Sequence, residues 1–141
     1  MSKLRTPEGD DHPDAALKNL LDAQILNRQN RPDGAAYLSG YVVESALKSI
    51  WHLETGNPRK GHDLLTLSKA VSAIATVANA KTAKYFGKET CAVPSSAIAG
   101  WNPEMRYRSP AMSASDAQVW CNVADAVYLE TVAQMRLDGV L

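Results

Sequence analysis

Four side chains are spaced so that they could act on a phosphate group. Glu44 precedes Lys48 by four residues, which is the favourable order for an ion pair on a helix. Arg106 and Arg108 stand in a short segment with prolines on both sides. Because the guanidinium fork matches phosphate geometry, we predict that these two arginines contact a phosphate.

His62 and Asp63 stand where a helix is predicted to begin. A histidine can carry a proton near neutral pH, and an aspartate is favourable at a helix N-terminus. We favour a structural role for His62, as a cap or a cover of the core, and keep a site role as the alternative. Metal-free RNA cleavage needs a base, an acid and a cation, so His62 with the two arginines is the candidate catalytic set.

Glu44 needs a cationic partner, because a carboxylate buried in an apolar helix is otherwise costly. We predict Arg106 from across the bundle as that partner, with the intrahelical pair to Lys48 as the alternative. A structural ion pair is favoured over a ligand site, and the two roles can coexist. Trp101 and Tyr107 are interpreted as packing residues rather than base-stacking platforms, whereas Arg108 is expected to be exposed. We expect His12 in a terminal arm and His52 facing solvent or a dimer rim.

Apolar residues recur with helical spacing in four segments, at about residues 13–30, 33–54, 63–78 and 113–138. The second segment is apolar over most of its circumference, which predicts a central helix. No period-two pattern indicates a strand. We therefore predict an all-α bundle forming a single domain over residues 13–141, preceded by a flexible N-terminal arm at residues 1–12.

The stretch at residues 79–100 gives no clear prediction. Its alanine-rich beginning can continue the third helix as far as Phe86, after which Gly87 and Pro94 interrupt the pattern. Residues 101–110 contain two prolines and should be extended or turn-like. Ser113 or Ser115 is the expected cap of the last helix, and Gly139 is its expected stop.

Composition excludes several classes of protein. The 141 residues include 15 Lys plus Arg and 15 Asp plus Glu, so a grip on long duplex DNA by charge alone is not expected. No apolar run is long enough to span a membrane and no apolar signal region is present, so we expect a cytoplasmic protein. Cys91 and Cys121 are expected to be free thiols rather than a disulfide. No glycine-rich phosphate loop, zinc-ligand spacing or catalytic triad is present, so we expect no metal and no cofactor.

Three segments together resemble one known family, the HEPN domains. They correspond in order and spacing to motifs of the second helix, the third helix and the turn before the last helix, over about residues 14 to 138. The segments are Val43-Glu44-Ser45-Ala46-Leu47-Lys48, Gly61-His62-Asp63-Leu64-Leu65-Thr66-Leu67 and Met105-Arg106-Tyr107.

The resemblance implies an up-and-down bundle of four or five helices that often forms a homodimer. HEPN domains occur in toxin–antitoxin pairs, beside minimal nucleotidyltransferases, and in RNA-processing and phage-defence systems. Many are metal-independent ribonucleases that carry an arginine, four to six residues and then a histidine near the last long helix. No histidine follows Arg106 or Arg108 at that spacing, so the fold is expected to carry over and the ribonuclease activity is not.

Three functions follow as hypotheses. The first is a non-catalytic protein that binds a nucleotide, RNA or a partner nucleotidyltransferase in a toxin–antitoxin, defence or stress system. The second is a ribonuclease with a displaced acid or base, and the third is a purely structural module. A homodimer through the second and last helices is expected in each case. The predicted binding residues are Glu44, Lys48, His62, Asp63, Trp101, Arg106, Tyr107 and Arg108.

Overall fold

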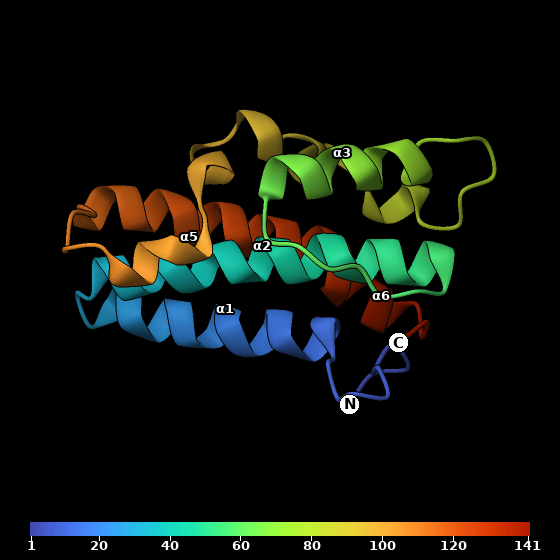
Figure 1. Ribbon diagram of the computed structural model, residues 1–141, viewed down its shortest axis with the longest axis horizontal. Helices are drawn as coiled ribbons and strands as arrows, with labels where there is room; N and C mark the ends of the chain where they lie inside the picture. The colour runs from blue at the N-terminus through green and yellow to red at the C-terminus, as the bar shows by residue number, and fades with distance from the viewer.

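The computed structural model describes all residues 1–141, and the chain is built from helices, turns and loops without a strand. This confirms the predicted all-α bundle (Figure 1). Four helices of twelve or more residues form its body, and α4 and α6 add one turn each. Their bounds are α1 His12–Arg28, α2 Pro32–Thr55, α3 Leu64–Ala75, α4 Lys88–Cys91, α5 Ala114–Tyr128 and α6 Gln134–Leu137.

Local signals set where the helices begin and end. The side chains of Asp11, Asp63 and Ser113 cap α1, α3 and α5 by accepting a hydrogen bond from a backbone N–H three residues on. Gly56, with φ of 75°, ends α2 in the left-handed conformation that glycine adopts without strain. Gly139 likewise has a positive φ after α6, and the π-helical turn Leu129–Ala133 joins α5 to α6. The predicted cap at Ser113 and the predicted stop at Gly139 are confirmed.

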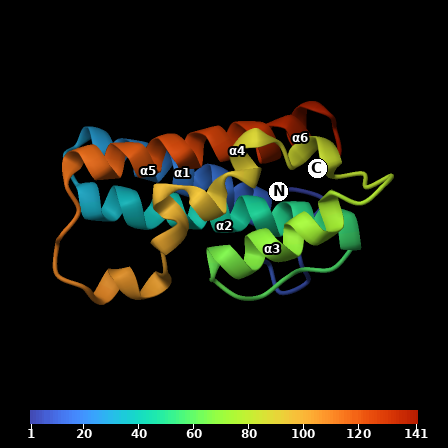
Figure 2. The same cartoon turned by 90° about the horizontal axis from the view of Figure 1, so that it is seen from above.

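The helices run in directions that the connections explain. A short turn at residues 29–31 makes α1 and α2 antiparallel neighbours (Figures 1 and 2). The loop at residues 56–63 then returns along α2, because His62 contacts Glu44 in the middle of that helix. The backbone N–H of Met112 donates to Asp33 at the start of α2, so α5 begins there. Consequently α3 and α5 both run parallel to α2.

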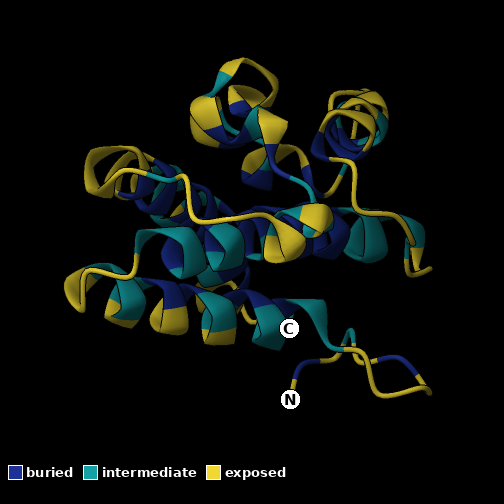
Figure 3. Ribbon diagram, turned by 60° about the vertical axis from the view of Figure 1, so that its left-hand side comes forward, coloured by how far each residue is buried: buried dark blue, intermediate teal, exposed yellow.

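Helix α2 is the centre of the bundle, as its apolar circumference predicted. Thirteen of its 24 residues are buried, and α1, α3 and α5 all pack against it. Exposed positions lie on the outer faces of the surrounding helices and in the loops (Figure 3). No large apolar side chain of α2 is fully exposed, and the predicted dimer face stays a prediction. Exposed apolar side chains remain at Leu21 and Ile25 on α1 and at Val119 on α5.

The third helix does not continue toward Phe86. The helix ends at Ala75, and the chain passes through three short 3-10 turns and α4 before residue 101. Tyr85, Val93 and Ile98 are buried in the core along this path. Burial of these side chains outweighs the helix propensity of the alanines, which is a weaker preference.

Trp101 packs directly on the backbone of α2, which confirms its predicted packing role. Its side chain is 2% exposed, and its indole N–H donates to the carbonyl of Tyr37 at 2.9 Å. A Cβ atom at Gly40 would lie 2.1 Å from the indole ring. Only glycine at position 40 therefore lets this ring seat against the helix.

The N-terminal residues predicted as an arm lie against the bundle. The backbone N–H and hydroxyl of Ser2 both donate to the carboxylate of Asp11, and Lys3 donates to the carbonyl of Gly139. Thr6 is buried, and the predicted flexibility of this segment stays a prediction.

Cys91 is exposed, Cys121 is buried, and both are free thiols. None of the helices combines the length with the apolar character that crossing a lipid bilayer requires.

Candidate functional site

A buried carboxylate connects α2 to the loop that precedes α3. Glu44 is 4% exposed and lies midway along α2. One of its oxygens accepts a hydrogen bond from Nζ of Lys48 at 2.7 Å, and the other lies 2.9 Å from Nδ1 of His62. Both oxygens are therefore partnered, which makes burial of the charge tolerable.

The backbone explains why these three groups meet. Glu44 and Lys48 are one helical turn apart, so their side chains lie on the same side of α2. His62 reaches them because the loop at residues 56–63 runs back along that helix. Asp63 then caps α3 through the backbone N–H of Thr66. Of the predicted binding residues, Glu44, Lys48 and His62 are brought together, and Asp63 has a capping contact instead.

The predicted ion pair between Glu44 and Arg106 does not form. Arg106 lies in the 3-10 turn Pro103–Tyr107, where its guanidinium group is exposed. A hydrogen bond to Tyr37 and the neighbouring Tyr107 raise the pKa of Arg106, and its guanidinium carbon lies 4.7 Å from the centre of the Tyr107 ring. The turn faces the first half of α2, whereas Glu44 is already neutralised by Lys48 on its own helix. The alternative prediction, an intrahelical pair of Glu44 with Lys48, is confirmed.

Two tyrosines fill the space between His62 and Arg106. The hydroxyl groups of Tyr37 and Tyr41 lie 3.2 Å apart, and the Tyr41 ring lies 6.4 Å from the His62 ring, centre to centre. Burial, followed by the hydrogen bond to Tyr37, raises the pKa of Tyr41 to about 12. Tyr41 is therefore a neutral hydroxyl at physiological pH, and it can hydrogen-bond a ligand but not act as a base.

Lys48 and His62 line a pocket of about 550 Å³, which we call the polar pocket. The loop at residues 56–63 forms one wall and the N-terminal segment forms the other. Three cationic side chains, two histidines and two carboxylates line it. The lining residues are Thr6, Glu8, Asp10, His12, Lys48, Pro58, Arg59, Lys60, Gly61 and His62.

Sequence reasoning missed Arg59, Lys60 and His12 as site residues. The guanidinium of Arg59 lies 4.4 Å from the centre of the Trp51 ring, and its Nε is buried without a hydrogen-bond partner. His12 is the first residue of α1 and not part of an arm. Burial, and then the nearby charge of Lys48, lower the pKa of His12. Arg59 and Lys60 precede His62 in the same loop, whereas His12 joins them only in the folded chain.

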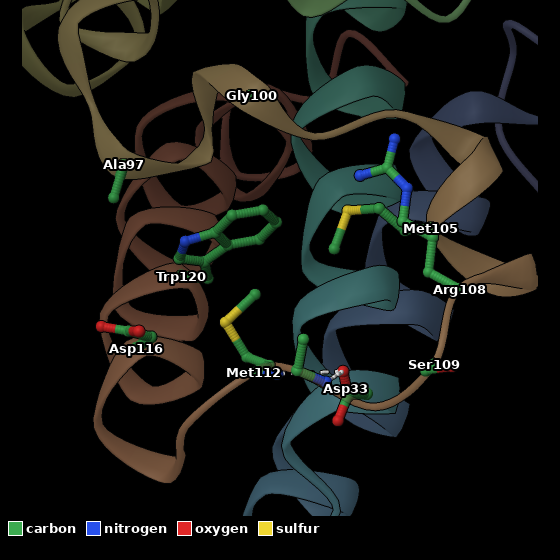
Figure 4. A pocket seen from close by; sticks show the side chains of 10 residues that line it. Asp33, Ala97, Gly100, Met105, Arg108, Ser109, Met112, Asp116 and Trp120 are labelled. Carbon is green, nitrogen blue, oxygen red and sulfur yellow. Dashed lines mark hydrogen bonds between the residues drawn. The ribbon is translucent and has the colours of Figure 1, made fainter.

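Three other predictions have definite outcomes. Tyr107 is 72% exposed, so its predicted packing role is wrong. His52 is only partly exposed and its Nδ1 is buried without a partner, so it does not point fully into solvent, and its predicted place at a dimer rim stays a prediction. Burial lowers the pKa of His52. Arg108 is exposed as predicted, but it lines a separate pocket near Trp120 (Figure 4).

The arrangement gives His62 a defined orientation. Because Nδ1 faces the Glu44 carboxylate, Nε2 is left for other partners, and the side chain is 57% exposed. A carboxylate that holds one ring nitrogen of a histidine fixes the tautomer and the ring position. The site can therefore present an oriented imidazole beside Lys48, Arg59 and Lys60, a set suited to a phosphate group.

The family comparison covers most of the chain. A family model described as HEPN domain matches residues 11–132. This range includes α1, α2, α3 and α5, together with Glu44, Lys48 and His62. No curated protein and no solved structure gives a significant match.

The contacts of Glu44 predict which substitutions destabilise the fold. Lys48→Met should lower the free energy of unfolding by about 3 kcal/mol, because a buried carboxylate loses its cation. Arg106→Ala should leave this free energy unchanged, because Arg106 does not neutralise Glu44. Urea denaturation of both variants measures the difference.

The double variant Glu44→Gln/Lys48→Met is the matched control. It removes both charges together and should recover much of the loss seen with Lys48→Met. A large loss of unfolding free energy in Arg106→Ala, with little loss in Lys48→Met, would show that Arg106 and not Lys48 pairs with Glu44.

Proposed function

This chain belongs to the HEPN domain family, whose members are typically nucleotide-binding or ribonuclease-related, and we propose that it binds the phosphate groups of RNA or a nucleotide at the polar pocket. The observation that carries the proposal is the convergence of Lys48, Arg59, Lys60 and His62 on one pocket, with His62 oriented by the buried Glu44.

The charges of the pocket support an anionic ligand. Lys60 is exposed on the loop and free to move onto a phosphate, whereas Arg59 is held against Trp51 with an unsatisfied N–H. An unpartnered buried donor is costly, and the guanidinium of Arg59, which lines the pocket, carries further N–H groups that can donate to a ligand oxygen. Glu8 and Asp10 of the facing wall are exposed carboxylates that can turn toward water.

Arg106 supports the same proposal from outside the pocket. Because Glu44 is neutralised by Lys48, no carboxylate forms an ion pair with Arg106. Its guanidinium is exposed beside the hydroxyl groups of Tyr37 and Tyr41. A phosphate backbone that leaves the polar pocket past His62 would meet these hydroxyls and then this guanidinium.

A specific observation favours RNA cleavage as the second candidate. His12 and His62 line the same pocket, and Lys48 lies beside them. Cleavage without a metal needs one group to accept the proton of the 2′-hydroxyl and another to protonate the departing 5′-oxygen. The lowered pKa of His12 suits the accepting role at neutral pH. His62 can take the donating role only in its doubly protonated form, from Nε2, and Lys48 can stabilise the charge of the pentacovalent phosphorus.

Partners stay predictions. We propose a homodimer, or a complex with a nucleotidyltransferase in a toxin–antitoxin, defence or stress system. The support is the exposure of Leu21, Ile25 and Val119 on α1 and α5, since exposed apolar side chains that cluster can form an interface.

Binding should depend on the cations of the pocket. Lys60→Ala should weaken binding of a 5′-phosphorylated single-stranded oligoribonucleotide and lower the slope of log affinity against log salt by about one, because one phosphate contact is lost. Isothermal titration at several salt concentrations measures both. Lys88→Ala removes an exposed lysine that does not line the pocket and should leave both values unchanged. Equal binding by all three proteins would contradict the proposal.

Cleavage, if it is the function, should persist in EDTA and require both histidines. His12→Gln and His62→Gln should each lower the rate of cleavage of a labelled oligoribonucleotide by at least about 100-fold, the usual size of a general acid or base contribution. In a plot of cleavage rate against pH, the fall on the acid side should lie below pH 6.5. The reason is that His12, whose pKa is lowered from 6.5, stays unprotonated down to a lower pH. Cleavage equal in wild type and both variants would remove this candidate.

A further inference from the structure

A second pocket lies between α5, the start of α2 and the segment at residues 97–112. Its volume is about 510 Å³, which is within the range of pockets that hold small organic groups. We call it the Trp120 pocket. Its lining residues are Asp33, Ala97, Gly100, Met105, Arg108, Ser109, Ala111, Met112, Asp116 and Trp120.

The interior of the Trp120 pocket suits a flat ring. In Figure 4 the indole of Trp120 and the side chain of Met112 project from one side, and the thioether of Met105 faces them from the other. Indole rings stack on aromatic bases, and thioether sulfur makes favourable contacts with aromatic rings. The Trp120 side chain is nearly buried, at 9% exposed, so its position is fixed before a ligand arrives.

Polar groups at the rim distinguish a nucleobase from an apolar side chain. Arg108 and Asp116 line the pocket and are exposed, and neither forms an ion pair. The Asp33 carboxylate is already engaged by the backbone N–H groups of Ala111 and Met112, at 3.0 and 3.1 Å, which holds this wall in place. A base offers carbonyl and ring-nitrogen acceptors to a guanidinium and amino donors to a carboxylate, whereas a leucine or phenylalanine offers neither.

The two pockets are too far apart for one nucleotide. Asp33 of the Trp120 pocket and Lys48 of the polar pocket are fifteen residues apart on α2, which is about 22 Å of helix. Tyr37, Tyr41 and Arg106 lie over the part of α2 between them, and Tyr107 is exposed beside Arg106. A strand of several nucleotides could follow these side chains from one pocket to the other.

We infer that the Trp120 pocket accepts an unpaired base of a single-stranded RNA whose phosphates lie on the polar pocket and Arg106. The inference rests on the proposed function and names its substrate class as single-stranded RNA of several nucleotides, not a mononucleotide or a duplex. A base in a duplex is stacked and paired, and placing it in a pocket requires that it be extruded at a cost.

The test compares two RNA strands of equal length by isothermal titration. One is intact, and the other carries the same phosphates but lacks its bases. The intact strand should bind wild type about tenfold more tightly, the size of effect that stacking of one base gives. Ala97→Phe should abolish this preference by filling the pocket from an exposed position, without removing a core side chain. Val119→Phe, on the exposed face of α5 outside the pocket, is the control and should keep the preference.

A spectroscopic readout accompanies the titration. The indole N–H resonance of Trp120, identified with Trp120→Phe, should shift with the intact strand and not with the abasic one. Equal affinity of wild type for the two strands, or an unchanged preference in Ala97→Phe, would overturn the inference while leaving phosphate binding intact. Failure of both strands to bind would overturn the proposed function itself.

Discussion

The requirement that most constrains this protein is the neutralisation of a carboxylate at the centre of its bundle. Glu44 sits on the most buried helix, where an unpartnered charge would cost several kcal/mol. Lys48 satisfies one oxygen from the same helix and His62 satisfies the other from the following loop. Because His62 must reach the middle of α2, the loop at residues 56–63 runs back along that helix, and α3 begins there and runs parallel to it.

The same constraint separates rigid from adaptable parts of the site. The buried pair of Glu44 and Lys48 is fixed by packing, whereas His62 is oriented on one side and open to solvent on the other. Arg106 is not needed to neutralise Glu44, so its guanidinium is available at the surface beside two tyrosine hydroxyls. A surface that combines an oriented imidazole, nearby cations and a pocket lined by an indole suits a flexible polyanion whose bases are exposed.

The parts of the fold and of the candidate site that depend on neighbouring residues could be predicted from the sequence. The caps at Asp63 and Ser113, and the central place of α2, follow from spacing and residue type. The contact between Glu44 and His62 crosses a loop, so the motif indicated both residues but not their pairing. Arg106 was assigned to the wrong partner, because spacing cannot show that its turn faces the first half of α2. The polar pocket combines the N-terminal segment with the loop at residues 56–63, and only the folded chain brings those together.

The protonation of the His62 ring tests this account most directly. Nitrogen-15 NMR of the imidazole, recorded at a pH where the ring is neutral, distinguishes the two tautomers. The structure predicts a proton on Nδ1, donated to Glu44, and an unprotonated Nε2 that faces the pocket. A proton found on Nε2, with a spectrum that Glu44→Gln does not change, would mean that His62 is not held by the buried carboxylate.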